Sequence, residues 1–209
     1  SNPTDLIEAP KLGRKLPDVL GLNEVDLLLE QIDLGHPQGF RNRAMLEMLY
    51  GSGIRVSELV NLSLSNLFFQ ENLIRVTGKG NKQRLVPMGK FTKKFILFYI
   101  NNSRTQQNID SVYQDIVFLN RNGKILTRQM IFTIIKQLAL KADIKKKIGP
   151  HTFRHSFATH LLENGADIRT IQILMGHENI TTTEVYTHLD TQHLRSVIER
   201  FHPRDGSKR

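Results

Sequence analysis

The chain has 209 residues, of which 29 are Lys or Arg and 20 are Asp or Glu, so its formal net charge is +9. It contains no cysteine, which excludes disulfide bonds and thiolate chemistry, and no apolar run approaches the roughly 20 residues of a membrane-spanning helix. The length suffices for one large domain or two small ones. The basic charge favours a polyanionic partner such as nucleic acid, although a merely soluble basic protein has the same composition.

The chain begins with a predicted linker, which is followed by helices. Residues 2–17 contain Pro, Lys and Arg with weak apolar periodicity, which is typical of a linker. Asn23 is predicted to cap a helix over residues 24–32, and a second helix is predicted over residues 41–50.

A glycine-flanked arginine follows the second helix, in the segment Gly51-Ser52-Gly53-Ile54-Arg55. The glycines end the helix and allow close backbone approach, and Arg55 begins a further short helix over residues 56–62. The fork of a guanidinium group matches two phosphate oxygens, so this arginine suits phosphate binding, with an ordinary surface arginine as the alternative. Glu58, three residues on, either orients Arg55 or pairs with it at the surface.

The hydrophobic period then changes from helical to extended. Three short strands are predicted over residues 66–69, 73–77 and 82–87, and the Gly-rich turn before the last indicates an antiparallel hairpin. Lys79 lies between two glycines at the tip of this turn. Its ammonium group can enter a groove and supply a proton there, and a plain turn lysine is the alternative.

Helices are predicted over residues 91–101 and 127–141, the first with Phe95, Phe98 and Tyr99 in the core. A short strand is predicted between them at residues 116–119. The basic run at residues 141–147 is either a patch that contacts a phosphate backbone or a solvated loop.

The stretch from Pro150 to His188 carries most of the residues that suit catalysis. Phe153, Phe157 and Leu161 recur at intervals of four, which predicts a helix over residues 152–164 with one buried stripe. His151 and Arg154 are three residues apart and share a face at the N-terminus of this helix. Free N–H groups and the helix dipole favour a phosphate at that end.

Two further candidate residues follow this helix. Asp167 is predicted to cap the next helix and Gly176 to end it in the left-handed conformation, which leaves His177 just beyond a helix end. A capping-box pattern over residues 181–184 predicts another helix, with Tyr186 one turn inside it. Two histidines, an arginine and a phenol suit the dianionic, phosphorane-like transition state that forms when an oxygen nucleophile attacks a phosphate group.

The order and wording of these segments resemble the catalytic set of the tyrosine site-specific recombinases of the phage integrase family, here Arg55, Lys79, His151, Arg154, His177 and Tyr186. The segments Gly-Ile-Arg-Val-Ser-Glu-Leu, Thr-Gly-Lys-Gly-Asn-Lys-Gln-Arg-Leu-Val-Pro and His-Thr-Phe-Arg-His-Ser-Phe-Ala-Thr-His-Leu-Leu are similar to those of the Xer branch. Leu-Met-Gly-His and Thr-Thr-Glu-Val-Tyr-Thr-His complete the pattern. The resemblance extends from about Leu16 to Pro203.

We expect an α+β fold that is mainly α-helical, with a small three-stranded antiparallel sheet that carries Lys79. The resemblance implies that residues 18–203 form the catalytic domain and that residues 204–209 are a polar tail. It also implies that residues 1–17 are the junction with a helical DNA-core-binding domain, which the family's full-length members carry before this one. The amphipathic helix predicted over residues 191–201 docks either on its own domain or on a neighbour's. In the family it would dock into the next protomer of a tetrameric synapse.

The resemblance also assigns the reacting groups. Tyr186 is expected to attack a phosphodiester of double-stranded DNA, which forms a 3′-phosphotyrosine and releases a 5′-hydroxyl. A phenol has a pKa of about 10 and needs help to lose its proton, for which His151 is the expected base. Lys79 is expected to protonate the leaving 5′ oxygen as general acid.

The remaining residues of the set are expected to bind the phosphate. Arg55 and Arg154 would hold its non-bridging oxygens, His177 would donate a further hydrogen bond, and Glu58 would support Arg55. These cationic side chains take the place that a divalent metal has in other nucleases, so neither a metal nor another cofactor is expected.

The sequence also permits other hypotheses. His151 and His155 have the spacing of zinc ligands on a helix, but no Glu lies between them and Arg154 would repel a cation. A DNA-binding module without catalysis would need no Tyr186, and a type IB topoisomerase uses similar residues in a single protomer. Chromosome-dimer resolution in cell division and integration or excision of a mobile element fit equally, and we expect a cytoplasmic, nucleoid-associated protein without membrane contact.

Overall fold

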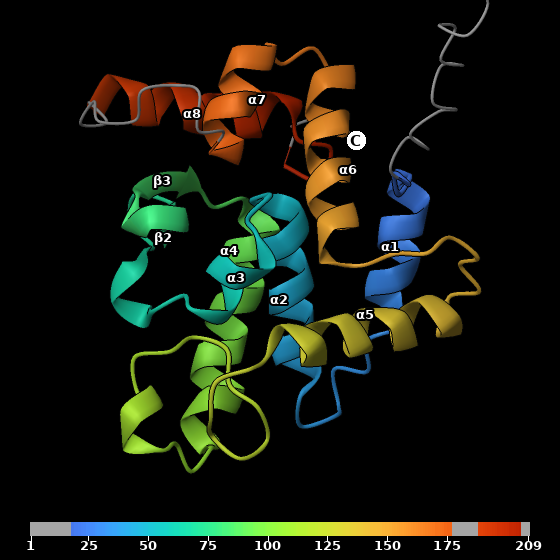
Figure 1. Ribbon diagram of the computed structural model, residues 1–209, viewed down its shortest axis with the longest axis vertical. Coiled ribbons are helices and arrows are strands. Elements are labelled where there is room, and N and C mark those ends of the chain that lie inside the picture. Colours follow the sequence, from blue (N-terminus) through green and yellow to red (C-terminus); the bar gives the residue numbers. More distant parts are fainter. Residues whose placement is uncertain (1–17, 177–187, 206–209) are drawn as a thin grey trace, which may run out of the picture.

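The computed structural model describes residues 18–176 and 188–205, except for the side chains of residues 188–190. Its helices are α1 (Leu22–Glu30), α2 (Gly39–Gly51), α3 (Val56–Val60), α4 (Lys90–Phe98), α5 (Arg128–Lys141), α6 (Pro150–Glu163), α7 (Ile168–Met175) and α8 (His188–Phe201). Its strands are β1 (Leu67–Phe68), β2 (Leu73–Thr77) and β3 (Gln83–Pro87). None of the described helices has the length and apolar composition that crossing a membrane requires. Figure 1 shows α2 and α4 in the middle, with α6, α7 and α8 at one end of the molecule.

The expected sheet is present and has the order β1-β2-β3, with both pairs antiparallel. In the hairpin of β2 and β3, Ile74 pairs with Val86 and Val76 pairs with Arg84. The turn places Gly80 at a φ of 70°, a left-handed conformation that glycine adopts without steric cost. The α+β class and the predicted hairpin are therefore confirmed.

Helix α2 forms the centre of the core, since every residue from Ala44 to Gly51 is buried, which is more than two helical turns. It packs against α4 and against α6. Its fully buried apolar side chains are Ala44, Met45, Leu46, Met48, Leu49 and Tyr50. On α6 the predicted stripe of Phe153, Phe157 and Leu161 is also fully buried. Each such side chain contributes about 1.5–3 kcal/mol through burial, so the first turn of α6 is held in a fixed position.

Three expectations about local structure are wrong. Helix α1 begins at Leu22 with Gly21 as its N-cap, because the carboxylate of Glu24 accepts the Gly21 N–H at 2.7 Å and makes a cap by Asn23 unnecessary. Phe98 is 41% exposed and stacks on Phe40 at the edge of the core, with ring centroids 5.7 Å apart. Residues 116–119 form no strand, because Ile116 and Leu119 each pair with one other residue in an isolated bridge, Ile116 with Ser63 and Leu119 with Ile125.

The C-terminal residues pack on the domain of their own chain. The buried face of α8 consists of Leu194, Val197 and Ile198. Arg204 and Asp205 were expected in a polar tail, which the structure corrects. Asp205 is buried and accepts the backbone N–H of Lys90 at 2.6 Å, and Arg204 pairs with Glu47 at 3.0 Å. The start of α4 leaves N–H groups without a helical partner, and the Asp205 carboxylate satisfies one of them.

Candidate active site

Arg55 lies at a tight junction between α2 and α3. Gly53 has a φ of 59°, and a Cβ on it would lie 2.3 Å from the ring of Phe157, so this position requires glycine. Arg55 donates from Nη1 to Glu58 at 3.1 Å and from Nη2 to the carbonyl of Gly176 at 3.2 Å. Its side chain remains 40% exposed, so the guanidinium can still bind an anion.

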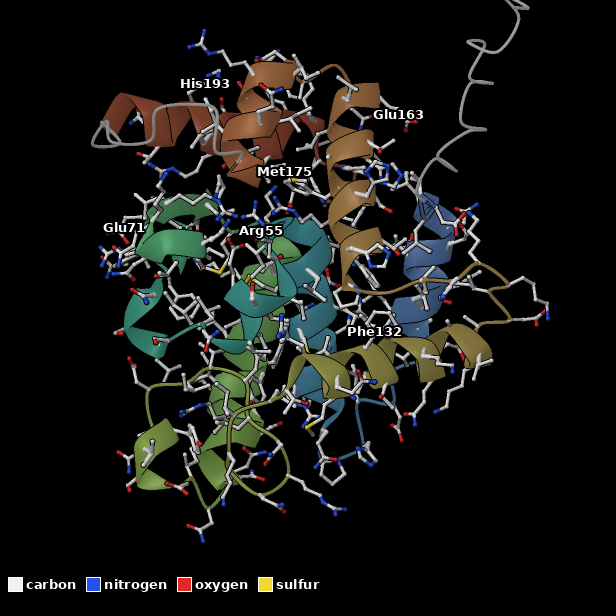
Figure 2. All side chains as sticks on the ribbon, viewed as in Figure 1. Arg55, Glu71, Phe132, Glu163, Met175 and His193 are labelled. Carbon is white, nitrogen blue, oxygen red and sulfur yellow. The ribbon has the colours of Figure 1, made fainter. Side chains whose placement is uncertain are left out.

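Arg154 reaches the same place from the first turns of α6. Its Nη1 donates to the carbonyl of Gly53 at 2.5 Å, and its Nη2 donates to the carbonyl of Met175. Burial lowers the pKa of Arg154 to about 9, with help from the charges of Arg55 and Arg84 and against the effect of Glu58. Arg154 therefore remains protonated at neutral pH. Figure 2 shows Arg55 and Met175 where the start of α3 meets the end of α7.

Arg84 is a member of this cluster that was not predicted from the sequence. It lies on β3 and is only 6% exposed, and its two Nη atoms donate to the two carboxylate oxygens of Glu58 at 2.6 and 3.0 Å. Burial alone would raise the pKa of Glu58, but the hydrogen bonds and charge of Arg84, followed by those of Arg55, hold it below its usual value. The burial of Arg84 could have been predicted from the sequence, because the alternation of side chains along β3 places Arg84 on the same buried face as Val86.

The cluster is positively charged as a whole. Arg55, Arg84 and Arg154 carry three positive charges against the one negative charge of Glu58, which leaves an excess of two. Arg55 and Arg154 are 99 residues apart, and both donate to carbonyl groups at the end of α7. The site is therefore suited to an anion with more than one charge.

Lys79 and His151 lie at exposed ends of their elements. Lys79 is exposed in the short turn Lys79–Asn81 between β2 and β3. His151 is exposed in the first turn of α6. It borders a hollow of about 420 Å³ together with Val56, Arg128, Gln129, Phe132 and Pro150. His177 and Tyr186, the other two predicted site residues, lie outside the described residues.

The other histidines of α6 give no sign of a metal site. His160 is buried, and its Nδ1 shares a hydrogen bond of 2.8 Å with the hydroxyl of Tyr50. Burial lowers the pKa of His160, which favours the neutral ring. Within residues 18–176 and 188–205, no group of three His, Asp or Glu side chains is placed to hold a metal ion.

Comparison with known proteins relates this arrangement to one family. The model of the phage integrase family matches residues 18–193. The chain is 48% identical over 203 residues to tyrosine recombinase XerD of Staphylococcus aureus. The matched region covers 97% of this chain and 68% of that protein. The chain is 49% identical to tyrosine recombinase XerD of Staphylococcus saprophyticus, and this match also covers 97% of this chain and 68% of that protein. The chain thus spans about two thirds of the length of these relatives.

Solved structures of similar proteins share the fold. XerA recombinase matches with a TM-score of 0.70 and 34% identity, over 90% of this chain and 66% of that one. XerH site-specific recombinase, solved in a pre-cleavage complex with its difH substrate, matches with a TM-score of 0.69 and 26% identity, over 90% of this chain and 55% of that one. An integrase from mycobacterium phage Brujita matches with a TM-score of 0.72 and 28% identity, over 94% and 62% of the two chains.

Proposed function

This chain belongs to the phage integrase family, as a tyrosine recombinase of the Xer type, and we propose that it breaks and rejoins DNA strands at specific sites. The observation that carries the proposal is the convergence of Arg55 and Arg154 on the end of α7, with Arg55 left 40% exposed. A phosphodiester gains a second negative charge as an oxygen nucleophile adds to it, and two fixed guanidinium groups stabilise that charge. The family match favours recombination over a topoisomerase or a non-catalytic DNA-binding module.

In the proposed mechanism, the hydroxyl of Tyr186 attacks the scissile phosphorus. A bond forms between the phenolic oxygen and phosphorus, the bond from phosphorus to the 5′ oxygen breaks, and a 3′-phosphotyrosine remains. His151 takes the phenolic proton, and Lys79 gives a proton to the leaving 5′ oxygen. The reverse attack by a 5′-hydroxyl rejoins a strand, so the covalent bond conserves the energy that ligation needs.

The phosphate is proposed to bind at the described cluster. Arg55 and Arg154 hold its non-bridging oxygens, and His177 donates a further hydrogen bond. The exposed part of Arg55 and the fixed position of Arg154 support this assignment. The mechanism uses protonated side chains where other nucleases use a metal ion, so cleavage is expected to proceed in EDTA.

We further propose how the domain takes part in an assembly. Residues 18–203 act as the catalytic domain, and residues 1–17 join it to a DNA-core-binding domain. The helix over residues 191–201 docks into the next protomer of a synapse of four, which requires it to leave the position on its own domain where Leu194 and Val197 are buried. The DNA partner and the net charge of +9 support a cytoplasmic, nucleoid-associated protein.

The test uses a nicked duplex that carries a candidate recombination site and loses a short fragment on cleavage, so that the covalent product accumulates. The unaltered protein is expected to form a protein–DNA adduct in EDTA, and Tyr186→Phe is expected to bind the same duplex without forming one. An adduct from both proteins would show that the nucleophile is wrong. Loss of the adduct on chelation would contradict the metal-free mechanism.

A further inference from the structure

Arg84 connects three elements that the proposed reaction uses. It lies on β3, the strand that follows the turn carrying Lys79. Its Nη atoms donate to Glu58 of α3, and its Nε donates to the carbonyl of Leu174 in the last turn of α7 at 3.2 Å. A side chain with 6% exposure that makes these three bonds fixes the three elements relative to one another.

The end of α7 is shaped to lie against this arginine. Gly176 has a φ of 62°, and a Cβ on it would lie 2.9–3.0 Å from three atoms of the Arg84 side chain. The carbonyl of the same glycine accepts a hydrogen bond from Arg55. Arg84 and Arg55 therefore share both Glu58 and the end of α7, and a change at one arginine is transmitted directly to the other.

Sharing the carboxylate decides how much of Arg55 is available to a ligand. Arg84 takes both oxygens of Glu58 at 2.6 and 3.0 Å, which leaves Arg55 with one side-chain bond of 3.1 Å to the same group. Without Arg84, a buried carboxylate would have Arg55 as its nearest cation. A bidentate pair of the two would then be strongly favoured, because an unpaired buried charge is costly.

We propose that Arg84 is a positioning residue of strand cleavage, which holds Glu58 so that the guanidinium of Arg55 stays free to bind the scissile phosphate. The inference rests on the proposed function, because it concerns the same phosphate site. Arg84 itself is buried beneath the cluster and acts through Glu58 and Arg55, without a contact of its own to DNA.

The test compares single-turnover rates of adduct formation on the nicked duplex for the intact protein and its variants. Arg84→Met is expected to lower the rate by roughly ten- to a hundredfold, the scale on which misplaced groups slow enzymes, while DNA affinity changes less than about threefold. Adding Glu58→Gln to Arg84→Met removes the charge that competes for Arg55, so the double variant is expected to cleave faster than Arg84→Met alone. Arg84→Lys keeps the positive charge but loses the forked guanidinium group. Its rate is expected to lie between that of the unaltered protein and that of Arg84→Met.

Arg41→Met is the matched control. Arg41 is also 6% exposed and donates to the carbonyl of Leu119 at 3.1 Å, away from this cluster. It is expected to lower the melting temperature without changing the rate per folded molecule. If Arg84→Met does not fold, as judged by its thermal melt, Arg84→Lys carries the comparison, with and without Glu58→Gln.

Two results would overturn the inference while leaving the proposed function intact. One is an unchanged rate in the folded Arg84 variants. The other is a double variant that cleaves no faster than the single variant it contains, since a merely structural role predicts no recovery. Absence of an adduct from the unaltered protein would instead overturn the proposed function, and the inference with it.

Discussion

Replacing Gly53 by alanine should damage both stability and the arginine cluster. The φ of 59° places alanine in the left-handed region, which costs about 1–2 kcal/mol. The new methyl carbon would also lie 2.3 Å from the ring of Phe157, a fully buried side chain that has no open space to enter. Overpacking of this kind costs a further 1–3 kcal/mol, so we expect a loss of roughly 2–5 kcal/mol in the free energy of unfolding.

Gly80→Ala is the control that separates the two contributions. Gly80 has a φ of 70°, but a Cβ on it would meet no atom within 4 Å. Alanine there should cost only the backbone strain of about 1–2 kcal/mol. Urea unfolding of both variants, followed by circular dichroism, measures the difference. Equal losses in the two variants would refute the reasoning, because the contact with Phe157 would then carry no energy.

Gly53→Ala should also reduce the rate of DNA cleavage. The carbonyl of Gly53 accepts the 2.5 Å hydrogen bond from Arg154, so a shift of this backbone displaces a phosphate-binding group. We expect Gly53→Ala to form the covalent adduct at least tenfold more slowly per folded molecule, as a displaced catalytic group does. Phe157→Leu in the same chain should recover part of both losses by making room for the methyl group.

Three further outcomes are expected. Burial lowers the pKa of His202 to about 3 from 6.5. The contribution of His202 to stability is therefore fully present above pH 6.5 and is lost as the pH falls toward 3, because in this range the unfolded chain takes up a proton that the folded protein does not. Burial raises the pKa of Asp205, so this carboxyl group acts in the opposite direction. His202→Gln should therefore flatten the fall in stability on acidification by about 1.4 kcal/mol per pH unit between pH 6.5 and 4, as chemical denaturation measured across that range will show. Tyr50→Phe removes the 2.8 Å hydrogen bond to His160 and should cost about 1–3 kcal/mol in urea unfolding, with adduct formation unchanged. Lys79→Met should cleave slowly on ordinary DNA but regain most of its rate on DNA with sulfur in place of the 5′ bridging oxygen, because a thiolate leaves without a proton; equal defects on both substrates would argue against Lys79 as the general acid.

Local patterns in the sequence were sufficient to predict the ends of α7, the buried stripe of α6 and the hairpin, but not the cap of α1. Asp167 caps α7 by accepting the Thr170 N–H at 2.8 Å, and Gly176 ends that helix in the left-handed conformation, both as predicted. The buried stripe of α6 follows from a four-residue spacing, and the hairpin follows from a glycine-rich turn between two alternating segments. The order of the catalytic motifs was enough to predict the family, which the comparisons confirm.

Only the tertiary structure decided which charges far apart in the sequence meet. Arg55 and Arg154 are brought together because the carbonyls of Gly53, Met175 and Gly176 lie at one junction, and no local pattern contains that fact. The same holds for Arg84, which is 26 residues from Glu58, and for Asp205, which caps α4 from 115 residues away. Spacing along the chain predicts periodic faces and helix ends, because these arise from the backbone geometry of a few residues. The pairing of buried charges instead depends on how distant elements pack, since each charge must find its partner where the core excludes water.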